Sequence, residues 1–586
     1  MNKRLLVWLS LVGTFLCCSG RTASVGEFPD QREREEVRIV LKGKPPTLNP
    51  LLTTSSVSRY ITEHIFQTLN YRNPTTYELS PALASLPEVR ELSNGKTSYD
   101  YRLDSLAMWP NGSRVTAYDV IFTLKALLNP LIEKAGPYQS YYSMVSDVLV
   151  TSPDSLSFSV VTNRPYFLAT ESIGDLYVYP RYAYDPHGYL DEVSLAELTS
   201  YTPDETDWIE ENESLARFAQ SFTNPEKGYI PSQIVGSGPY ELESWQSGKT
   251  IKLRLREDYW ARDRKEDHLR ATPKWLTFEI ITDNTTTANA LRDQLVDVVI
   301  DMPLDQYLKL KEEDYLGEMY DFVTLPSLKY WSILLNQSDP LLADSLTRKA
   351  LAYLVDVDGI VDNFFPGLAR RVTGPVLPSK AYYNEGLQPI PYDPDKAKEL
   401  LARAGWSDTN GNGILDKEIR GEVREMSFDL LTNSNPTNQG ICLYIAQTAS
   451  QVGVDVQVVR QESLRLLERL NTGQYTASLY GLLFEPTPDD FFQTWHSASV
   501  PPAGSNRGFF RSAEADSLIR QIAVTTDSVA RAPLYKRFQE IVYQDQPMIF
   551  LYTPDVSLVI SKRLDYTLIS LAPNLHFNAL RVRETS

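Results

Sequence analysis

A capped helix is predicted by the stretch Met108-Trp-Pro-Asn-Gly-Ser-Arg-Val-Thr-Ala-Tyr-Asp-Val-Ile-Phe122. Thr116 and Asp119 have the spacing of a capping box, in which each residue's side chain satisfies the other's backbone N–H. Apolar residues follow at helical intervals through Leu128, and Asn129-Pro130 ends the pattern. The stretch therefore predicts a helix of about three turns with one buried face.

Strands and helices alternate along the rest of the chain. Tyr99–Leu103, Ile251–Leu255 and Val454–Val458 alternate apolar and polar residues, as half-buried strands do. Asp393-Pro394 offers an N-cap and a first-turn proline for a helix that ends near Gly405. No repeat period is visible. With 586 residues, the chain exceeds the size of about 250–300 residues that one hydrophobic core supports, so we expect an α/β or α+β protein of several domains.

Composition restricts the class of protein. Hydrophobic residues make up 42% and charged residues 23%, as in soluble globular proteins. The net charge of −18 argues against nucleic acid as a partner. Beyond the N-terminal pair Cys17-Cys18, the chain contains Cys442, which lies in an apolar helical pattern. We expect a buried, unreactive thiol there and a fold stabilised without disulfides.

The N-terminus resembles an export signal. Lys3 and Arg4 precede an uncharged apolar run from Leu5 to Leu16, which is too short to span a bilayer as a helix. The run ends at Cys17-Cys18, and this arrangement resembles a bacterial lipobox with Cys18 as the lipid-modified first residue of the mature protein. Phe15 departs from the leucine that the pattern prefers. The alternative is an ordinary cleaved signal or a short anchor. In each case we expect the remaining chain to be exported.

Motifs for catalysis are not apparent in the sequence. The five histidines are scattered without metal-binding spacing, and no Gly-x-Ser-x-Gly elbow occurs. Val235-Gly-Ser-Gly-Pro239 is glycine-rich but lacks the lysine of a phosphate-binding loop. The sequence therefore predicts a protein that is not an enzyme.

One loop could hold a metal ion. Its oxygen-bearing side chains occupy positions 1, 3, 5 and 9 of a calcium loop, with glycine at position 6; they are Asp408, Asn410, Asn412 and Asp416. Position 12 is Ile419 instead of a bidentate glutamate. The alternative is a turn rich in Asn and Asp between a helix and a strand. We expect no other cofactor.

Six segments, in this order, resemble the extracellular solute-binding proteins of family 5, the peptide/nickel type of receptor for ABC importers. The first five are Lys44–Pro50, Leu79–Ala84, Met108–Phe122, Val235–Tyr240 and Arg348–Asp356, and the sixth is Tyr392–Trp406. Met108–Phe122 matches the most specific part of the family pattern, although Trp109 and Asn111 replace its usual Phe and Asp. Together the segments cover nearly the whole mature chain.

The resemblance implies an α/β fold of the bilobal, periplasmic-binding-protein-like type II class, with three subdomains and a hinged cleft. The implied organisation begins with a lipoprotein signal peptide (1–17) and a flexible tether (18–35). Lobe I would comprise 36–70, 180–275 and 515–586, with a subdomain inserted at 71–179, and lobe II would comprise 276–514.

The resemblance also implies a substrate-binding lipoprotein that captures a solute between its lobes and delivers it to a membrane permease. An oligopeptide is the favoured solute. Alternatives are an oligosaccharide or another solute, or a receptor for sensing or adhesion on the same fold. A nickel or haem chelate contacted by His496 is a further family option, which the scarcity of histidine disfavours. We expect a monomer, held at the bacterial cell envelope by its lipid on the periplasmic side or the cell surface.

Binding residues follow from the resemblance by position. Peptide-binding relatives pair the ligand ammonium with an Asp; Phe484 falls at about that position, and the neighbouring Glu485 could serve instead. Where some members carry an Arg for the ligand carboxylate, this chain has Asn433 and Asn435. The aromatics expected near the cleft are Tyr480, Phe484 and Trp495, with core packing as the alternative for each. Asn506 resembles an Asn of the family whose role is partly structural.

Overall fold

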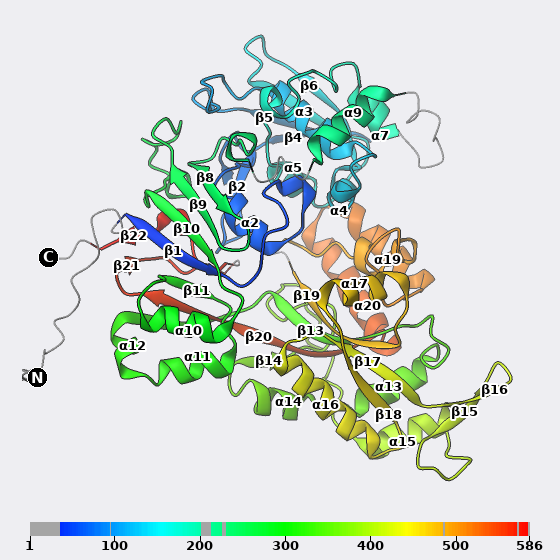
Figure 1. The fold of residues 1–586 in the computed structure, drawn as a ribbon. Coiled ribbons are helices and arrows are strands. Elements are labelled where there is room, and N and C mark those ends of the chain that lie inside the picture. Colours follow the sequence, from blue (N-terminus) through cyan, green and yellow to red (C-terminus); the bar gives the residue numbers. More distant parts are fainter. Residues whose placement is uncertain are drawn as a thin grey trace, which may run out of the picture.

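The computed structural model describes residues 35–93, 95–200, 212–224, 230–484, 487–570 and 573–583. A mixed sheet of 12 strands runs through the molecule in the order β18-β17-β19-β13-β20-β11-β1-β10-β9-β8, and β12 and β14 also pair with β20 (Figure 1). The strands are β1 (Glu36–Leu41), β8 (Tyr240–Gln246), β9 (Thr250–Leu255), β10 (Trp275–Ile280), β11 (Val298–Ile300), β12 (Tyr320–Pro326), β13 (Lys329–Leu335), β14 (Ala369–Arg371), β17 (Ser427–Thr432), β18 (Asp455–Arg460), β19 (Ala477–Leu483) and β20 (Met548–Ser561).

Strand β20 divides this sheet into two halves. Its beginning, from Met548 to Tyr552, pairs with β13, whereas its end, from Leu558 to Ile560, pairs with β11. Strands β12 and β13 also run from one end of β20 to the other, antiparallel to it. They follow one another in the chain and are separated by Ser327 and Leu328. We call β1 and β8–β12 the first half, and β13, β14 and β17–β19 the second half. The two halves are thus joined by a pair of antiparallel crossover strands.

Helices cover both halves. In the second half, parallel strands β17, β18 and β19 are connected by helices on the pattern β17-α16-β18-α17-β19. The helices are α13 (Ser345–Tyr353), α14 (Val357–Phe364), α15 (Pro394–Arg403), α16 (Pro436–Ser450), α17 (Ser463–Thr472), α18 (Phe492–Trp495), α19 (Ala513–Val524) and α20 (Ser528–Asp545). In the first half they are α2 (Ser56–Thr62), α10 (Asn284–Arg292), α11 (Leu304–Lys311) and α12 (Asp314–Met319).

A separate sheet of four strands lies above the first half in Figure 1, in the order β4-β5-β7-β6. Its strands are β4 (Glu88–Glu91), β5 (Thr97–Arg102), β6 (Val145–Val150) and β7 (Ser157–Thr162), and the helices around it are α3 (Ala117–Leu128), α4 (Gly136–Tyr142), α5 (Ala169–Gly174), α6 (Arg181–Tyr184), α7 (Leu195–Ser200) and α9 (Glu213–Phe222). Three short pairs of strands lie outside the two sheets: β2 (Asn70–Arg72) with β3 (Leu79–Pro81), β15 (Asp416–Ile419) with β16 (Glu422–Glu425), and β21 (Leu564–Asp565) with β22 (Arg581–Val582). Among the described residues, none of these helices has the length and apolar character needed to cross a bilayer.

The predicted cap of α3 is confirmed. The Asp119 carboxylate accepts hydrogen bonds from Thr116 N at 2.9 Å and from the indole Nε1 of Trp109 at 3.2 Å. Trp109 is itself 2% exposed. The aspartate therefore fixes the start of the helix and also satisfies the polar atom of a large buried ring, which explains why these residues occur together in one short stretch.

The boundaries expected for lobe II fall inside secondary-structure elements. The division at residue 276 falls inside β10, which pairs with β1 on one side and β9 on the other and so belongs to the first half. The division at 514–515 falls inside α19. Because residues 276–326 continue the first half of the sheet, the passage to the second half occurs at Ser327 and Leu328 instead. The sequence pattern did not show this, since strands of both halves have similar apolar runs.

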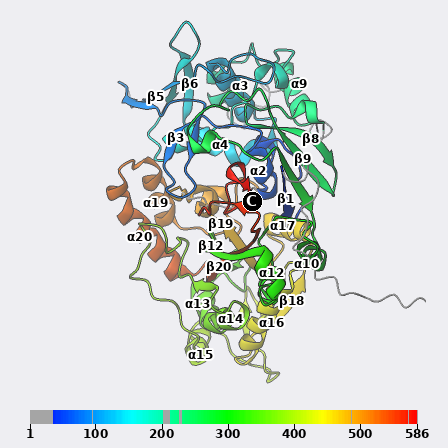
Figure 2. The ribbon, with the colours of Figure 1, turned by 90° about the vertical axis from the view of Figure 1, so that its left-hand side faces the viewer.

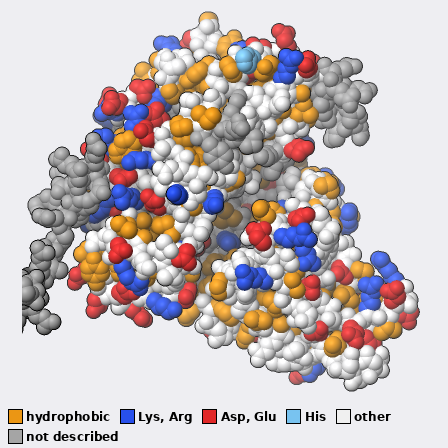
Figure 3. Space-filling model, viewed as in Figure 1, with side chains coloured by type: hydrophobic (Ala, Val, Ile, Leu, Met, Phe, Trp, Pro, Cys, Tyr) orange, Lys and Arg blue, Asp and Glu red, His pale blue; other side chains and the backbone are white. Residues whose placement is uncertain are grey.

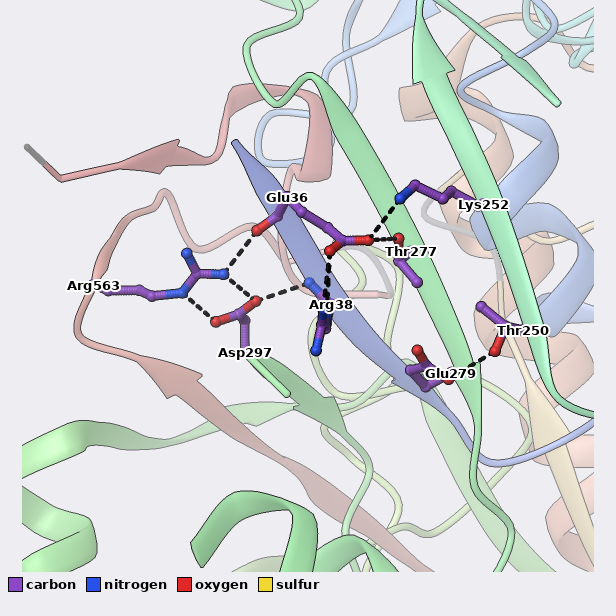
Figure 4. Close-up of polar contacts among 8 residues, drawn as sticks. All are labelled: Glu36, Arg38, Thr250, Lys252, Thr277, Glu279, Asp297 and Arg563. Carbon is purple, nitrogen blue, oxygen red and sulfur yellow. Dashed lines mark hydrogen bonds and ion pairs between the residues drawn. The ribbon is translucent and has the colours of Figure 1, made fainter. Parts of the chain in front are cut away.

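A polar network joins the N-terminal strand to the C-terminal part of the first half (Figure 4). Arg563 donates to both carboxylate oxygens of Asp297 at 2.5 Å and to the backbone oxygen of Glu36 at 2.7 Å. The Glu36 carboxylate accepts from Thr277 Oγ1 at 2.5 Å and pairs with Arg38 and Lys252. Neighbouring strands of the first half are therefore joined by ion pairs as well as by backbone hydrogen bonds.

Candidate functional site

The carboxyl ends of parallel strands from both halves meet where the halves join. In the first half, Lys42 follows β1 and Asp301 follows β11; in the second, Asn433 follows β17 and Phe484 follows β19. Ligands of α/β proteins bind at this edge of a sheet. Figure 3 shows the surface hollowed between the two parts of the molecule at this level, with Lys and Arg atoms in and around the hollow. We take this edge as the candidate binding cleft.

Phe484 links the cleft to the crossover strands. Its backbone N donates to the carbonyl oxygen of Leu328 at 2.7 Å, and its ring packs on Tyr330, with ring centroids 5.0 Å apart. Leu328 is one of the two residues between β12 and β13. The end of β19 is therefore attached to the point where the chain passes from one half to the other. Glu485, which follows, lies outside the described residues.

Tyr480 lies four residues earlier on β19 and is half-buried. Its hydroxyl accepts from Arg507 Nη1 at 2.8 Å, while Arg507 Nε donates to Asn471. The arginine thus holds the tyrosine at one side of β19 and carries a positive charge to the same place. Tyr480 and Phe484 are the two aromatic residues expected at the cleft that retain partial exposure.

Asn433 and Asn435 organise the start of α16. Asn435 is its N-cap, and its Oδ1 accepts from Asn438 N at 3.1 Å. Asn433 Oδ1 accepts from Asn435 N and from Asn438 Nδ2 at 3.1 and 3.0 Å. The amide oxygen of each is occupied by the helix cap. Their NH₂ groups remain the part that a ligand could use, because no described residue accepts a hydrogen bond from either.

Trp495 and Asn506 lie inside the second half. Trp495 is 3% exposed and packs edge-on against Phe510 and Phe538, both with centroids at 5.9 Å. Asn506 is 1% exposed, and its Nδ2 donates to the backbone oxygens of Trp495, His496 and Phe510. Protein encloses both side chains in this structure. The contacts of Trp495 agree with core packing, the alternative expected for it. The hydrogen bonds of Asn506 agree with a structural role.

Several charged groups near the cleft were not anticipated from the sequence. Lys42 Nζ donates to the neutral oxygens of Thr287 and Asn284 at 2.6 and 3.2 Å, and burial lowers the pKa of Lys42 to about 8. Lys329 Nζ lies 4.3 Å from the ring centroid of Trp331, and burial lowers its pKa as well. Both lysines stand directly at a strand end, which is the signal that could have identified them.

Glu63 is a further group of this kind. It caps the C-terminus of α2 and is half-buried, and burial raises the pKa of its carboxyl to about 7, against the opposing charge of Arg59. A carboxyl with this pKa is partly protonated at neutral pH. The first half therefore presents a basic group, Lys42, and an acidic group, Glu63, whose pKa values burial shifts toward neutral pH.

The side-chain oxygens of the candidate calcium loop accept hydrogen bonds from other groups of the same loop. Asp408 accepts from the backbone N of Gly411 and Gly413, and Asn410 and Asn412 accept from N atoms two residues ahead. Asp416 accepts from Thr409 N at 2.8 Å and from Thr409 Oγ1 at 2.6 Å. Within the described ranges, no group of three or more His, Cys, Asp or Glu residues could hold a metal ion. These bonds are those of an Asx-rich turn, which was the alternative expectation.

The ring nitrogens of His496 are both occupied. Nδ1 accepts from Ala498 N at 3.0 Å, and Nε2 lies 2.9 Å from Arg520 Nη1. Burial and the charge of Arg520 lower the pKa of this imidazole, against the opposing charge of Asp516. Cys442, as expected, is a buried thiol, and burial raises its pKa to about 12.

Comparison with known proteins agrees with this architecture. The model of the bacterial extracellular solute-binding proteins, family 5 Middle, matches residues 78–501. The oligopeptide-binding protein AppA of Bacillus subtilis is 25% identical over 529 residues, which cover 89% of this chain and 87% of that protein.

Solved structures share the fold. The structure of Bacillus subtilis AppA in complex with a nonapeptide superposes with a TM-score of 0.74 at 22% identity, covering 94% of this chain and 99% of that one. NikZ from Campylobacter jejuni in complex with Ni(L-His) gives a TM-score of 0.71 at 20% identity, covering 91% and 95%. The α/β bilobal fold expected from the sequence is confirmed. The chain belongs to the bacterial extracellular solute-binding proteins of family 5.

Proposed function

We propose that this solute-binding protein captures an oligopeptide between its two halves and delivers it to the permease of an ABC importer. The observation that carries the proposal is the tie between Phe484 and Leu328, which places the end of β19 at the passage between the halves. The likeness to AppA, an oligopeptide-binding protein, over 89% of the chain supports a peptide.

Glu485 is the residue that we propose for the peptide ammonium. It follows Phe484 directly, and a carboxylate inside a closed cleft is a strong partner for an ammonium group. Tyr480, Phe484, Asn433 and Asn435 would line the rest of the path. Because an amide at Asn433 or Asn435 carries no charge, the peptide carboxylate would not be gripped there. Recognition would then depend on the peptide backbone, as in strand addition, and would suit peptides of several lengths.

Closure supplies the mechanism of capture. One lobe would consist of the first half and the four-stranded sheet above it, and the other of the second half with α19 and α20. Rotation about the crossover strands would bring the strand ends of both halves onto the peptide. The free energy of closure comes from contacts that both halves make to the ligand, since a ligand shifts a conformational equilibrium only through a difference in affinity.

The N-terminal segment would hold the protein at the membrane. We propose that residues 1–17 are removed and that Cys18 carries the lipid, so that residues 18–35 act as a tether. A tether raises the effective concentration of the receptor at its permease. A protein on such a tether would work as a monomer at the cell envelope.

Binding of a tryptic digest of casein tests the proposal. The protein is mixed with the digest, separated by gel filtration, and the retained peptides are identified by mass spectrometry. We expect peptides to be retained, and the same digest after acetylation of its amines to be retained at least about tenfold less. Retention of neither digest, together with binding of a Ni–histidine chelate or an oligosaccharide, would overturn the peptide assignment in favour of those solutes.

A further inference from the structure

A second contact joins the two parts of the molecule, away from the crossover strands. Tyr166 and Phe167 follow β7 in the four-stranded sheet, and they meet residues of the second half. The Tyr166 hydroxyl donates to Asp490 Oδ2 at 2.7 Å, and Phe167 N donates to the carbonyl oxygen of Ala523, the penultimate residue of α19, at 3.0 Å. Figures 1 and 2 both place α19 beneath α4, on the border of the two parts.

The Phe167 ring adds an aromatic contact. The guanidinium carbon of Arg531 lies 4.6 Å from its centroid. Arg531 Nη1 also donates to the carbonyl oxygens of Thr525 and Thr526 at 2.7 and 3.2 Å, so the turn between α19 and α20 fixes this guanidinium. Tyr166 and Phe167 are each 8% exposed and Arg531 is 6% exposed. The contact therefore excludes water, although it consists of few groups.

The receiving surface around Asp490 is independently braced. The neighbouring Asp489 carboxylate accepts from Tyr382 at 2.9 Å and lies 3.4 Å from Lys380 Nζ. Tyr535 donates to the backbone oxygen of Asp489 at 2.6 Å. These bonds all lie within the second half, so they would survive a rotation between the halves. Tyr166 and Phe167 meet a surface that needs no rearrangement to receive them.

We propose that Tyr166 and Phe167 form a latch that holds the two halves together over a bound solute and slows its release. Residues on opposite sides of a cleft, away from the hinge, separate whenever the hinge opens. A buried hydrogen bond from a hydroxyl to a carboxylate is among the stronger kinds. It would favour the closed form without making it permanent. This inference rests on the proposed capture of a solute between the halves.

Amide hydrogen exchange measures opening of the latch directly, because the Phe167 N–H donates one of its hydrogen bonds. We expect the Phe167 amide to exchange about tenfold faster in Tyr166→Phe than in the wild type, while the amides of β7 are unchanged. Adding the casein digest should slow exchange at Phe167 in the wild type. The matched control is Tyr142→Phe, which removes a hydroxyl that donates to Ser172 O at 2.7 Å on the same side of the cleft; it should leave the Phe167 amide unaffected.

Release of bound peptide gives the second measurement. With peptides from the digest loaded, Tyr166→Phe and Asp490→Ala should each release them about tenfold faster, and the double variant should be no faster than either single one. Equal exchange at Phe167 in the wild type and in Tyr166→Phe, or additive effects on release, would overturn the latch. A wild-type protein that retains no peptide would instead overturn the proposed function, and the Phe167 amide would still show whether this contact opens as a unit.

Discussion

Phe484 is hydrogen-bonded to Leu328, with its backbone N 2.7 Å from the Leu328 carbonyl oxygen. Phe484 directly follows β19, the strand near which the family resemblance predicts ligand recognition, and Leu328 lies between the crossover strands β12 and β13. The end of β19 is therefore attached to the passage between the halves by this bond and by the β13–β19 ladder that begins beside it.

Glu485→Ala should weaken binding of peptides with a free amino terminus at least about tenfold, which is about 1.4 kcal/mol. The loss follows because the ammonium would be buried without its carboxylate. Isothermal titration with a peptide recovered from the casein digest measures the effect. Glu422→Ala, in the exposed strand β16, is the matched control and should bind normally. Unchanged affinity in Glu485→Ala would remove this residue from the site.

Trp495→Ala should reduce stability more than it reduces affinity. The ring is buried against Phe510 and Phe538, and removing a buried tryptophan costs about 3–5 kcal/mol. Urea unfolding measures the loss, and titration of the folded fraction should give peptide affinity near that of the wild type. Phe484→Ala should reduce peptide affinity more than it reduces stability, because Phe484 is only partly buried. A Trp495→Ala protein that is stable but fails to bind would place the ring at the ligand after all.

Arg563→Met should destabilise the protein by about 3 kcal/mol, because it leaves the Asp297 carboxylate buried without its partner. Asp297 has a side-chain exposure of 7%. Arg217→Met is the control: its pair with Glu213 is exposed to solvent, and exposed pairs contribute little to stability. Equal effects of the two substitutions in urea unfolding would show that the network of Figure 4 does not hold the first half together.

Glu36 should make stability depend on pH. Burial opposes its ionisation, but the hydrogen bond from Thr277 and the charges of Arg38 and Lys252 outweigh burial, so the pKa of Glu36 lies below its ordinary 4.5. A carboxylate with a lowered pKa stabilises the fold above its unfolded-state pKa, and this contribution disappears as the pH falls through the folded-state value. Urea unfolding from about pH 6 to about pH 3 should therefore show a shallower decline in Glu36→Gln than in the wild type. Parallel declines would contradict this.

Local chemistry explains how far the sequence predicted the structure. The caps of α3 and α15, the strand alternation of β5 and β9 and the burial of Cys442 follow from residues close together in the chain, and all are present. The passage between the halves at Ser327 and Leu328 depends on which strands β20 pairs with, a relation over more than two hundred residues. Periodicity carries no such information.

The candidate site shows the same limit. Asn433 and Phe484 were predicted by resemblance, and the structure has them directly after β17 and β19. Lys42, Lys329 and Glu63 matter because burial changes their pKa values, and burial depends on the tertiary structure. The contact of Tyr166 with Asp490 joins residues 324 positions apart, for which the sequence offers no signal.

Cys18→Ser should release the protein from the membrane fraction if Cys18 carries the anchor. The substitution removes the thiol that would form the thioether and leaves the rest of the chain intact. Fractionation of cells followed by immunoblotting measures the distribution, and intact mass of the wild type should show a diacylglycerol adduct. Cys17→Ser should stay with the membrane. Membrane association of Cys18→Ser equal to that of the wild type would rule out this anchor.

Native mass spectrometry of the purified full chain tests the central claim most directly, because it weighs whatever solute the cleft has retained. The account predicts a ladder of bound masses that fragment into peptides of several lengths, and the ladder should collapse in Glu485→Ala. A single bound mass corresponding to a sugar or a metal chelate, unaffected by Glu485→Ala, would contradict the assignment of this protein to oligopeptides.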